Sequence, residues 1–146
     1  VQTSSKEREA MILRITREQN RLLLKETRKR WPEEACGLLF GDVSGKEAVV
    51  KKVVSVCNVL ESPTNFQVDP EEFLKELSKA EKEGMQFIGF FHSHPASPQP
   101  SPTDVRYMRL WPGDIWLVIS SVDYSMKAYR IVDDELAGLH VEITDE

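Results

Sequence analysis

The stretch FHSHPASPQPSPTD, residues 91 to 104, decides how this chain folds and what it does. It places two histidines two residues apart at the end of an apolar run. A proline-rich loop follows, and then Ser-Pro-Thr-Asp, which is typical of a helix start. Two interpretations compete. Either His92, His94 and Asp104 are three ligands of a metal site, or the stretch is a strand end followed by an ordinary helix cap.

The residues on either side of the loop favour the metal site. MQFIGFF, residues 85–91, is apolar on both faces, which predicts a central strand covered on both sides. Because alternate side chains of a strand leave the same face, His92 and His94 should project together. Asp104 is the third residue after a Ser101 N-cap, where the helix dipole helps to keep a carboxylate ionised. Two imidazoles and one carboxylate leave a fourth tetrahedral position for water, as in catalytic zinc sites.

The rest of the chain predicts strands mixed with helices and therefore a single α/β domain. A capping box of Thr16 and Gln19 begins a helix that runs to Arg30. Asp69 caps the next helix, which ends at Gly84. Further strands are predicted at 10–15, 35–40, 47–59, 114–122, 125–132 and 138–143, with a turn at 41–45 and a short helix at 101–110.

Both long helices should have one apolar side that packs on the sheet. For the first helix, these residues are Leu22, Leu23, Leu24 and Trp31. For the second helix, they are Phe73, Leu74, Leu77 and Ala80.

Composition limits the function classes. The chain has 146 residues, a net charge of −5 and a pI near 5.3, so nucleic acid is not its expected main partner. No apolar run approaches the roughly 20 residues of a membrane helix, and the cytoplasm is the expected location. Residues 1–9 are polar and predict a flexible tail before a domain at 10–146. Cys36 and Cys57 fit small buried hydrophobes, with a disulfide, zinc ligation or nucleophilic catalysis left open.

The chain also contains PEEACGLLFG at residues 32–41. Together with the motifs at residues 91–104, this segment resembles the JAMM/MPN+ (JAB/MPN/Mov34) metalloprotease family. The family pattern is a Glu before a Gly-containing strand, then His-x-His-Pro, a short loop and Ser-x-x-Asp. The resemblance covers roughly residues 12–143 and is strongest to the compact prokaryotic branch. It implies a curved, mixed, mostly antiparallel sheet flanked by two main helices, with a short helix after the His-x-His-Pro loop, similar to cytidine deaminases.

Carried over by position, the resemblance makes His92, His94 and Asp104 the ligands of one catalytic Zn²⁺. Glu34 corresponds to the catalytic glutamate and is preferred to Glu33 because it stands three residues before Gly37. Ser101 corresponds to the family's oxyanion-hole donor. The loop between His94 and Ser101 has six residues, 95–100, one fewer than is usual in the family.

The resemblance implies zinc-dependent hydrolysis of an isopeptide or peptide bond after the C-terminal tail of ubiquitin or a ubiquitin-like small modifier. The loop at 58–66 is the candidate edge to which such a tail would add as an extra strand. A processing peptidase for sulfur-carrier proteins and a non-catalytic interaction scaffold remain alternatives. A homodimer is possible, and the sequence does not identify the modifier.

Overall fold

The structure is a computed structural model that describes residues 11–56 and 68–145. The predicted tail at 1–9 and the predicted docking loop at 58–66 lie outside these residues. The described helices are α2 (Arg17–Arg30), α3 (Pro70–Lys82) and α4 (Pro102–Met108). The described strands are β1 (Ile12–Thr16), β2 (Cys36–Ser44), β3 (Glu47–Val56), β4 (Gln86–His94), β5 (Ile115–Ser120), β6 (Met126–Val132) and β7 (Glu135–Thr144).

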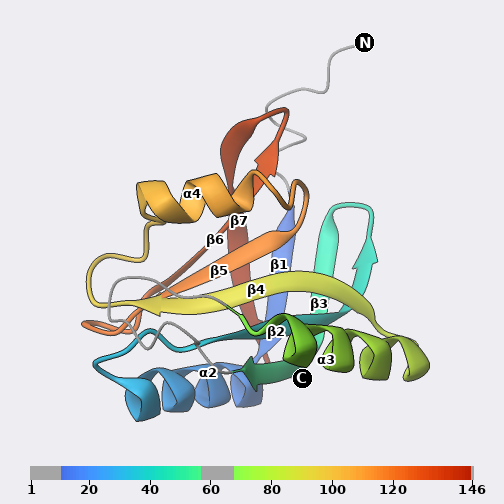
Figure 1. Cartoon of the computed structure of the whole chain (residues 1–146), viewed down its shortest axis with the longest axis horizontal. Coiled ribbons are helices and arrows are strands. Elements are labelled where there is room, and N and C mark those ends of the chain that lie inside the picture. Colours follow the sequence, from blue (N-terminus) through green and yellow to red (C-terminus); the bar gives the residue numbers. More distant parts are fainter. Residues whose placement is uncertain (1–10, 57–67, 146) are drawn as a thin grey trace.

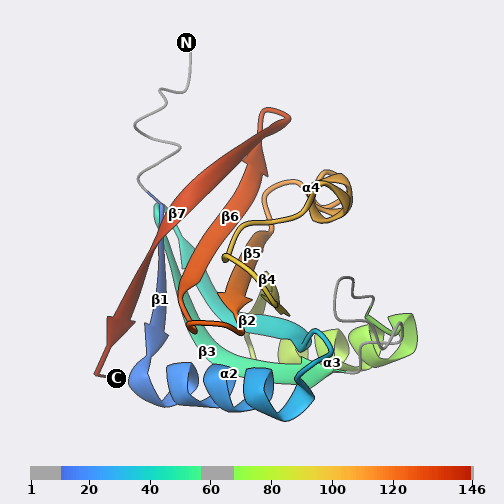
Figure 2. The ribbon, with the colours of Figure 1, turned by 90° about the vertical axis from the view of Figure 1, so that its left-hand side faces the viewer.

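The sheet is mixed, as expected, but it closes into a barrel in the order β1-β3-β2-β4-β5-β6-β7 (Figures 1 and 2). The pairs β1–β3, β1–β7 and β4–β5 are parallel, and the other four pairs are antiparallel. The short strand β1 closes the barrel because it pairs with β3 on one edge and β7 on the other. Such a pairing joins the two ends of the chain, which no local pattern reveals.

The helices begin where the sequence predicts. Thr16 and Gln19 form the capping box of α2, and the Asp69 side chain accepts a hydrogen bond from the backbone of Glu71 at the start of α3. Helix α2 lies across one end of the barrel, whereas α3 and α4 lie outside it (Figure 2). No helix within 11–56 or 68–145 is long and apolar enough to cross a membrane.

Three predicted helix contacts, at Leu22, Trp31 and Leu74, are wrong. Leu22 of α2 is 40% exposed. Trp31 is 64% exposed, because it is the C-cap of α2 and its backbone turns out of the helix at φ −50°, ψ 136°. The buried positions of α2 are Leu23 and Thr27, four residues apart on one face. Leu74 of α3 is 62% exposed, while Ala80 is buried.

The turn predicted at 41–45 is also wrong, because β2 continues to Ser44 and only residues 45 and 46 turn. Gly45 makes that turn with φ +58°, a conformation that favours glycine. Cys36 is buried and its thiol donates to the Val56 carbonyl at 3.6 Å, which agrees with a small buried hydrophobe. Cys57 lies outside the described residues, so its pairing stays a prediction.

The core has two layers, and β4 runs between them, as its composition predicts. Phe91 belongs to the cluster that fills the barrel, together with Leu13, Leu39, Leu117 and others. Phe90 faces the opposite way, into a second cluster beneath α3 and α4 that includes Ala80, Met108 and Trp116. The side of β4 that carries Phe90 therefore looks outward, toward the two helices.

Candidate metal centre

His92 and His94 end strand β4 on its outer side. Side chains two apart on a strand share a face, so both imidazoles follow Phe90 toward α4. His92 is fully buried and His94 is 8% exposed. Their rings lie 5.1 Å apart between centroids, and the His92 ring lies 6.3 Å from that of Trp116. The two imidazoles therefore lie next to the apolar side chain of Trp116, and a third polar group approaches them from another element.

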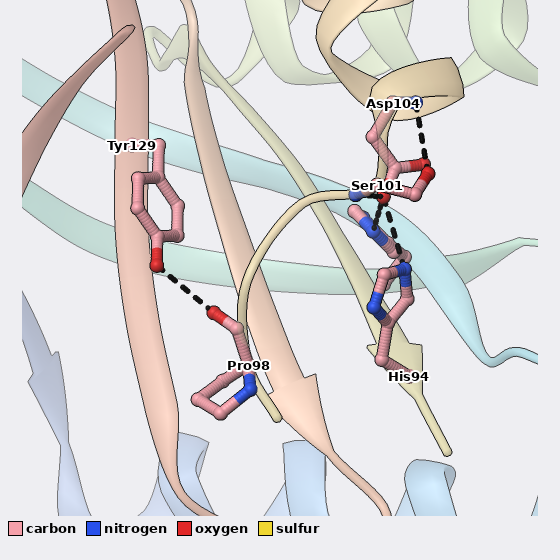
Figure 3. Close-up of polar contacts among 6 residues, drawn as sticks. His94, Pro98, Ser101, Asp104 and Tyr129 are labelled. Atoms are coloured by element: carbon pink, nitrogen blue, oxygen red, sulfur yellow. Dashed lines mark hydrogen bonds and ion pairs between the residues drawn. The ribbon is translucent and has the colours of Figure 1, made fainter. Parts of the chain in front are cut away.

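Helix α4 supplies that group, Asp104. The Ser101 hydroxyl accepts from the Asp104 backbone N–H at 3.1 Å, and Asp104 Oδ2 accepts from the Ser101 N–H at 2.9 Å. The same Oδ2 lies 3.1 Å from His92 Nε2. It also lies 2.9 Å from His94 Nε2 (Figure 3). The predicted helix cap therefore exists, and it aims the carboxylate at both imidazoles. The two interpretations of residues 91–104 are compatible.

Glu34 approaches the histidines from a distant part of the sequence. It precedes β2 and is 1% exposed, whereas Glu33 is only partly buried. A carboxylate oxygen of Glu34 and one nitrogen each of His92 and His94 lie within 4.8 Å of one another. The structure thus brings together all four predicted polar residues, with Asp104 in contact with both histidines and Glu34 close to them from another part of the chain.

The two carboxyl groups have opposite electrostatic environments. Burial, and after it the negative charge of Asp104, raises the pKa of Glu34 to about 9. Burial would also raise the pKa of Asp104, but hydrogen bonds from His92, His94 and the Ser101 backbone hold it well below its usual range. Burial lowers the pKa of His92 against the opposing effect of Asp104. The lowered pKa of Asp104 therefore favours its ionised form, and without a cation the raised pKa of Glu34 favours its protonated form.

These residues fit a divalent transition metal. Two imidazole nitrogens and an ionised carboxylate oxygen converge at one point, and this donor set is typical of zinc. Neutral imidazoles are required of ligands, and the lowered pKa of His92 favours that form. Glu34 is a possible additional ligand by distance alone. Its raised pKa instead suits a group that exchanges protons.

The loop between His94 and Ser101 is anchored at its middle. Pro98 is buried although its neighbours on both sides are exposed, and the Tyr129 hydroxyl donates to the Pro98 carbonyl at 3.1 Å (Figure 3). The His94 carbonyl accepts from the Ser121 N–H at 2.7 Å and from its hydroxyl at 3.1 Å. The sequence did not predict these contacts of Tyr129 and Ser121. The pairing of β4, β5 and β6 brings both residues to the loop and to the end of β4.

The chain is similar to several known proteins. Residues 16–132 match a family described as prokaryotic homologs of the JAB domain. A desampylase from Pyrococcus furiosus is 48% identical over 88 residues, which cover 60% of this chain and 59% of that protein. A desampylase from Haloferax volcanii is 39% identical over 114 residues, covering 77% and 79%.

A solved structure shares the fold over nearly the whole chain. The solution structure of protein DSY2949 from Desulfitobacterium hafniense superposes with a TM-score of 0.84 at 34% identity, covering 93% of this chain and 94% of that one. The aligned segment spans less than two thirds of the Pyrococcus protein's length.

Proposed function

This chain belongs to the family of prokaryotic JAB-domain proteins, and on that premise we propose that it is a zinc-dependent isopeptidase. Its substrate would be the bond after the C-terminal tail of ubiquitin or a ubiquitin-like small modifier. The observation that carries the proposal is the contrast between the two buried carboxyl groups, an ionised Asp104 and a Glu34 whose pKa is about 9. Paired carboxyl groups with divergent pKa values divide ligand and acid–base roles between them.

In this proposal His92, His94 and Asp104 hold the zinc ion. A bound zinc ion supplies Lewis acidity, which polarises a carbonyl and lowers the pKa of water toward about 7. Asp104 suits ligation because its lowered pKa favours the ionised form. The hydrogen bond from the Ser101 N–H fixes one of its oxygens between the two imidazoles.

Glu34 carries the proton transfers. The positive charge of a cation beside it favours the ionised form, so Glu34 then accepts a proton from the attacking water as the C–O bond forms. It returns this proton to the amine nitrogen as the C–N bond breaks. The products are a free carboxylate on the modifier tail and a free amine on the target.

Ser101 stabilises the negative charge that develops on the substrate's carbonyl oxygen. Its oxygen accepts the capping bond from the Asp104 N–H, which leaves its own O–H as a donor. Helix capping and oxyanion stabilisation therefore use different parts of one hydroxyl. Ser101 is partly exposed, so a substrate can reach it.

A pocket beside the site would accept apolar side chains of a polypeptide substrate. It has a volume of about 400 Å³ and includes Phe90, two residues before His92, and Tyr107, three residues after Asp104. Its other lining residues are Val68, Pro70, Phe73, Leu74, Trp111 and Trp116. This lining favours a protein tail over a small polar metabolite. A homodimer and a cytoplasmic location remain predictions.

A cleavage panel tests the proposal. Purified protein is incubated with lysine-linked conjugates of Gly-Gly-tailed modifiers and, in parallel, with linear sulfur-carrier fusions, with and without a zinc chelator. We expect cleavage of the lysine conjugates, loss of cleavage with the chelator, and recovery when zinc is added back.

The other outcomes of the panel contradict the proposal in separate ways. Cleavage of the linear fusions alone would assign the chain to sulfur-carrier processing. Chelator-resistant cleavage would exclude zinc chemistry. A zinc-loaded protein that binds modifiers and cleaves none of the substrates would be an interaction scaffold.

A further inference from the structure

Ser93 lies between the two histidines in the sequence, but its side chain is on the opposite side of β4 from theirs, because strand side chains alternate. It is only 2% exposed. Its Oγ accepts from the Ala35 N–H at 2.8 Å, and its own N–H donates to the Ala35 carbonyl at 2.9 Å. Ser93 therefore holds both backbone polar groups of the residue that follows Glu34.

This arrangement replaces a regular ladder bond. Cys36 and His92 are the last register pair of β2 and β4, so the next antiparallel pair is Ala35 with Ser93. In a regular pair of this kind, the Ala35 N–H would donate to the Ser93 carbonyl. Here the Ser93 hydroxyl is the acceptor instead. The ladder thus ends in a side-chain contact at the residue next to Glu34.

The bonded N–H belongs to the peptide that joins Glu34 to Ala35. The orientation of this peptide determines where the Glu34 side chain leaves the backbone, since Glu34 stands just before β2 begins. Upstream in this loop, the Glu33 N–H donates to the Arg30 carbonyl at 2.9 Å. The Ser93 hydroxyl ties the Glu34–Ala35 peptide directly to the strand that carries the histidines.

We infer that Ser93 is a positioning residue for Glu34, in addition to the ligands and acid–base groups of the proposed function, on which this inference rests. The Ser93 hydroxyl fixes the Glu34–Ala35 peptide so that the Glu34 carboxylate stays beside His92 and His94. Ser93 thereby connects the two parts of the site. Its neighbours in β4, His92 and His94, supply the imidazoles, and Ser93 itself positions the Glu34 carboxylate.

The test compares Ser93→Ala, which removes the acceptor, with Ser93→Thr, which keeps it. Three quantities are measured in the full chain: bound zinc, the separate values of kcat and KM on a lysine-linked conjugate, and hydrogen exchange of the Ala35 amide in zinc-free protein. For Ser93→Ala we expect about one zinc, KM within about twofold, and kcat lower by roughly 10–100-fold, as for a misplaced catalytic group. Exchange of the Ala35 amide should accelerate by at least about tenfold. Ser93→Thr should restore both kcat and slow exchange.

Two results would overturn the inference. The first is an unchanged kcat in Ser93→Ala despite fast Ala35 exchange. The second is loss of zinc together with activity, because Ser93 would then act on the histidines. If Ser93→Ala does not fold, Ser93→Cys takes its place, because a thiol is similar in size but a weak acceptor. Failure of the proposed function is distinguishable, since wild-type protein would then cleave none of the conjugates. In that case unchanged Ala35 exchange in Ser93→Ala would still overturn the positioning role.

Discussion

Residues 92–104 and Glu34 reach the same site by different means. The first segment is local: a strand end, a six-residue loop and a helix cap place His92, His94 and Asp104 within thirteen consecutive residues. Glu34 comes from a loop before β2, and the next residue, Ala35, donates its N–H to Ser93 of β4. The proposed metal-binding half is thus determined by neighbouring residues, while the proposed proton-transfer half depends on the barrel being assembled.

The largest expected effect comes from breaking the local half. His94→Ala should reduce bound zinc from about one per chain to almost none and lower kcat/KM by at least about 10³-fold, since metal and Lewis acidity are lost together. Metal analysis and conjugate cleavage measure the two effects. The matched control is His140→Ala, because His140 is exposed on β7, outside the site. Normal zinc content in His94→Ala would contradict the ligand assignment.

Ser101 belongs to the same half but acts on the substrate in the proposed mechanism. Ser101→Ala should keep zinc and slow turnover by about 10²–10³, the usual cost of one oxyanion donor. It should also reduce stability by about 1 kcal/mol, because an N-cap is lost. Steady-state kinetics and urea unfolding separate the two effects. A change in stability with normal kcat would leave Ser101 as a cap only.

Glu34 should make the zinc-free protein sensitive to pH. Its folded pKa of about 9 lies above the ordinary value of 4.5, so the folded state binds the extra proton and stability falls as pH rises through this interval. The free energy of unfolding should decrease by at most about 1.4 kcal/mol per pH unit there. Urea unfolding of chelated protein at about pH 6 and about pH 8 measures the slope.

Glu34→Gln should flatten that slope, because the amide does not titrate. Glu33→Gln is the matched control, since Glu33 is the neighbouring, partly exposed carboxylate. If wild type and Glu34→Gln show the same pH dependence, Glu34 is not the buried proton carrier that its environment indicates.

The smallest effect should come from Tyr129→Phe, which removes the hydroxyl that donates to the Pro98 carbonyl. The loss of one neutral hydrogen bond should cost about 0.5–1.5 kcal/mol of stability. Turnover should fall by only a few fold, because the capping box still places Ser101 and Asp104. Thermal unfolding and kinetics measure both. A loss of zinc in this variant would show that the short loop, rather than the cap, holds Asp104.

The same contrast explains what the sequence could and could not predict. His92 and His94 follow from strand alternation, and Asp104 from a capping motif, so local rules are sufficient for them. The role of Glu34 came from family resemblance, because the contact that joins this segment to β4 links Ala35 and Ser93, nearly sixty residues apart. Barrel closure by β1, and the parts played by Ser93 and Tyr129, depend on strand register, which composition and periodicity do not encode.

Gly37 is an instructive intermediate case. It marks the position of Glu34 in the family pattern, and the structure supplies a physical reason for it. A Cβ at this position would lie 2.2 Å from both the Phe91 ring and the Val54 carbonyl oxygen. The glycine lets β2 pack closely against Phe91, and the adjacent Cys36–His92 register pair brings Glu34 to the histidines.

The central claim is that the two halves act together, with residues 92–104 binding the metal and Glu34 moving the proton. Its most direct test is the turnover of zinc-loaded Glu34→Gln on a lysine-linked modifier conjugate. The account predicts about one zinc per chain, as in wild type, with kcat reduced by at least about 10³-fold, because general acid–base catalysis alone contributes 10²–10⁴. Wild-type turnover in that variant, or loss of its zinc, would contradict the division of roles.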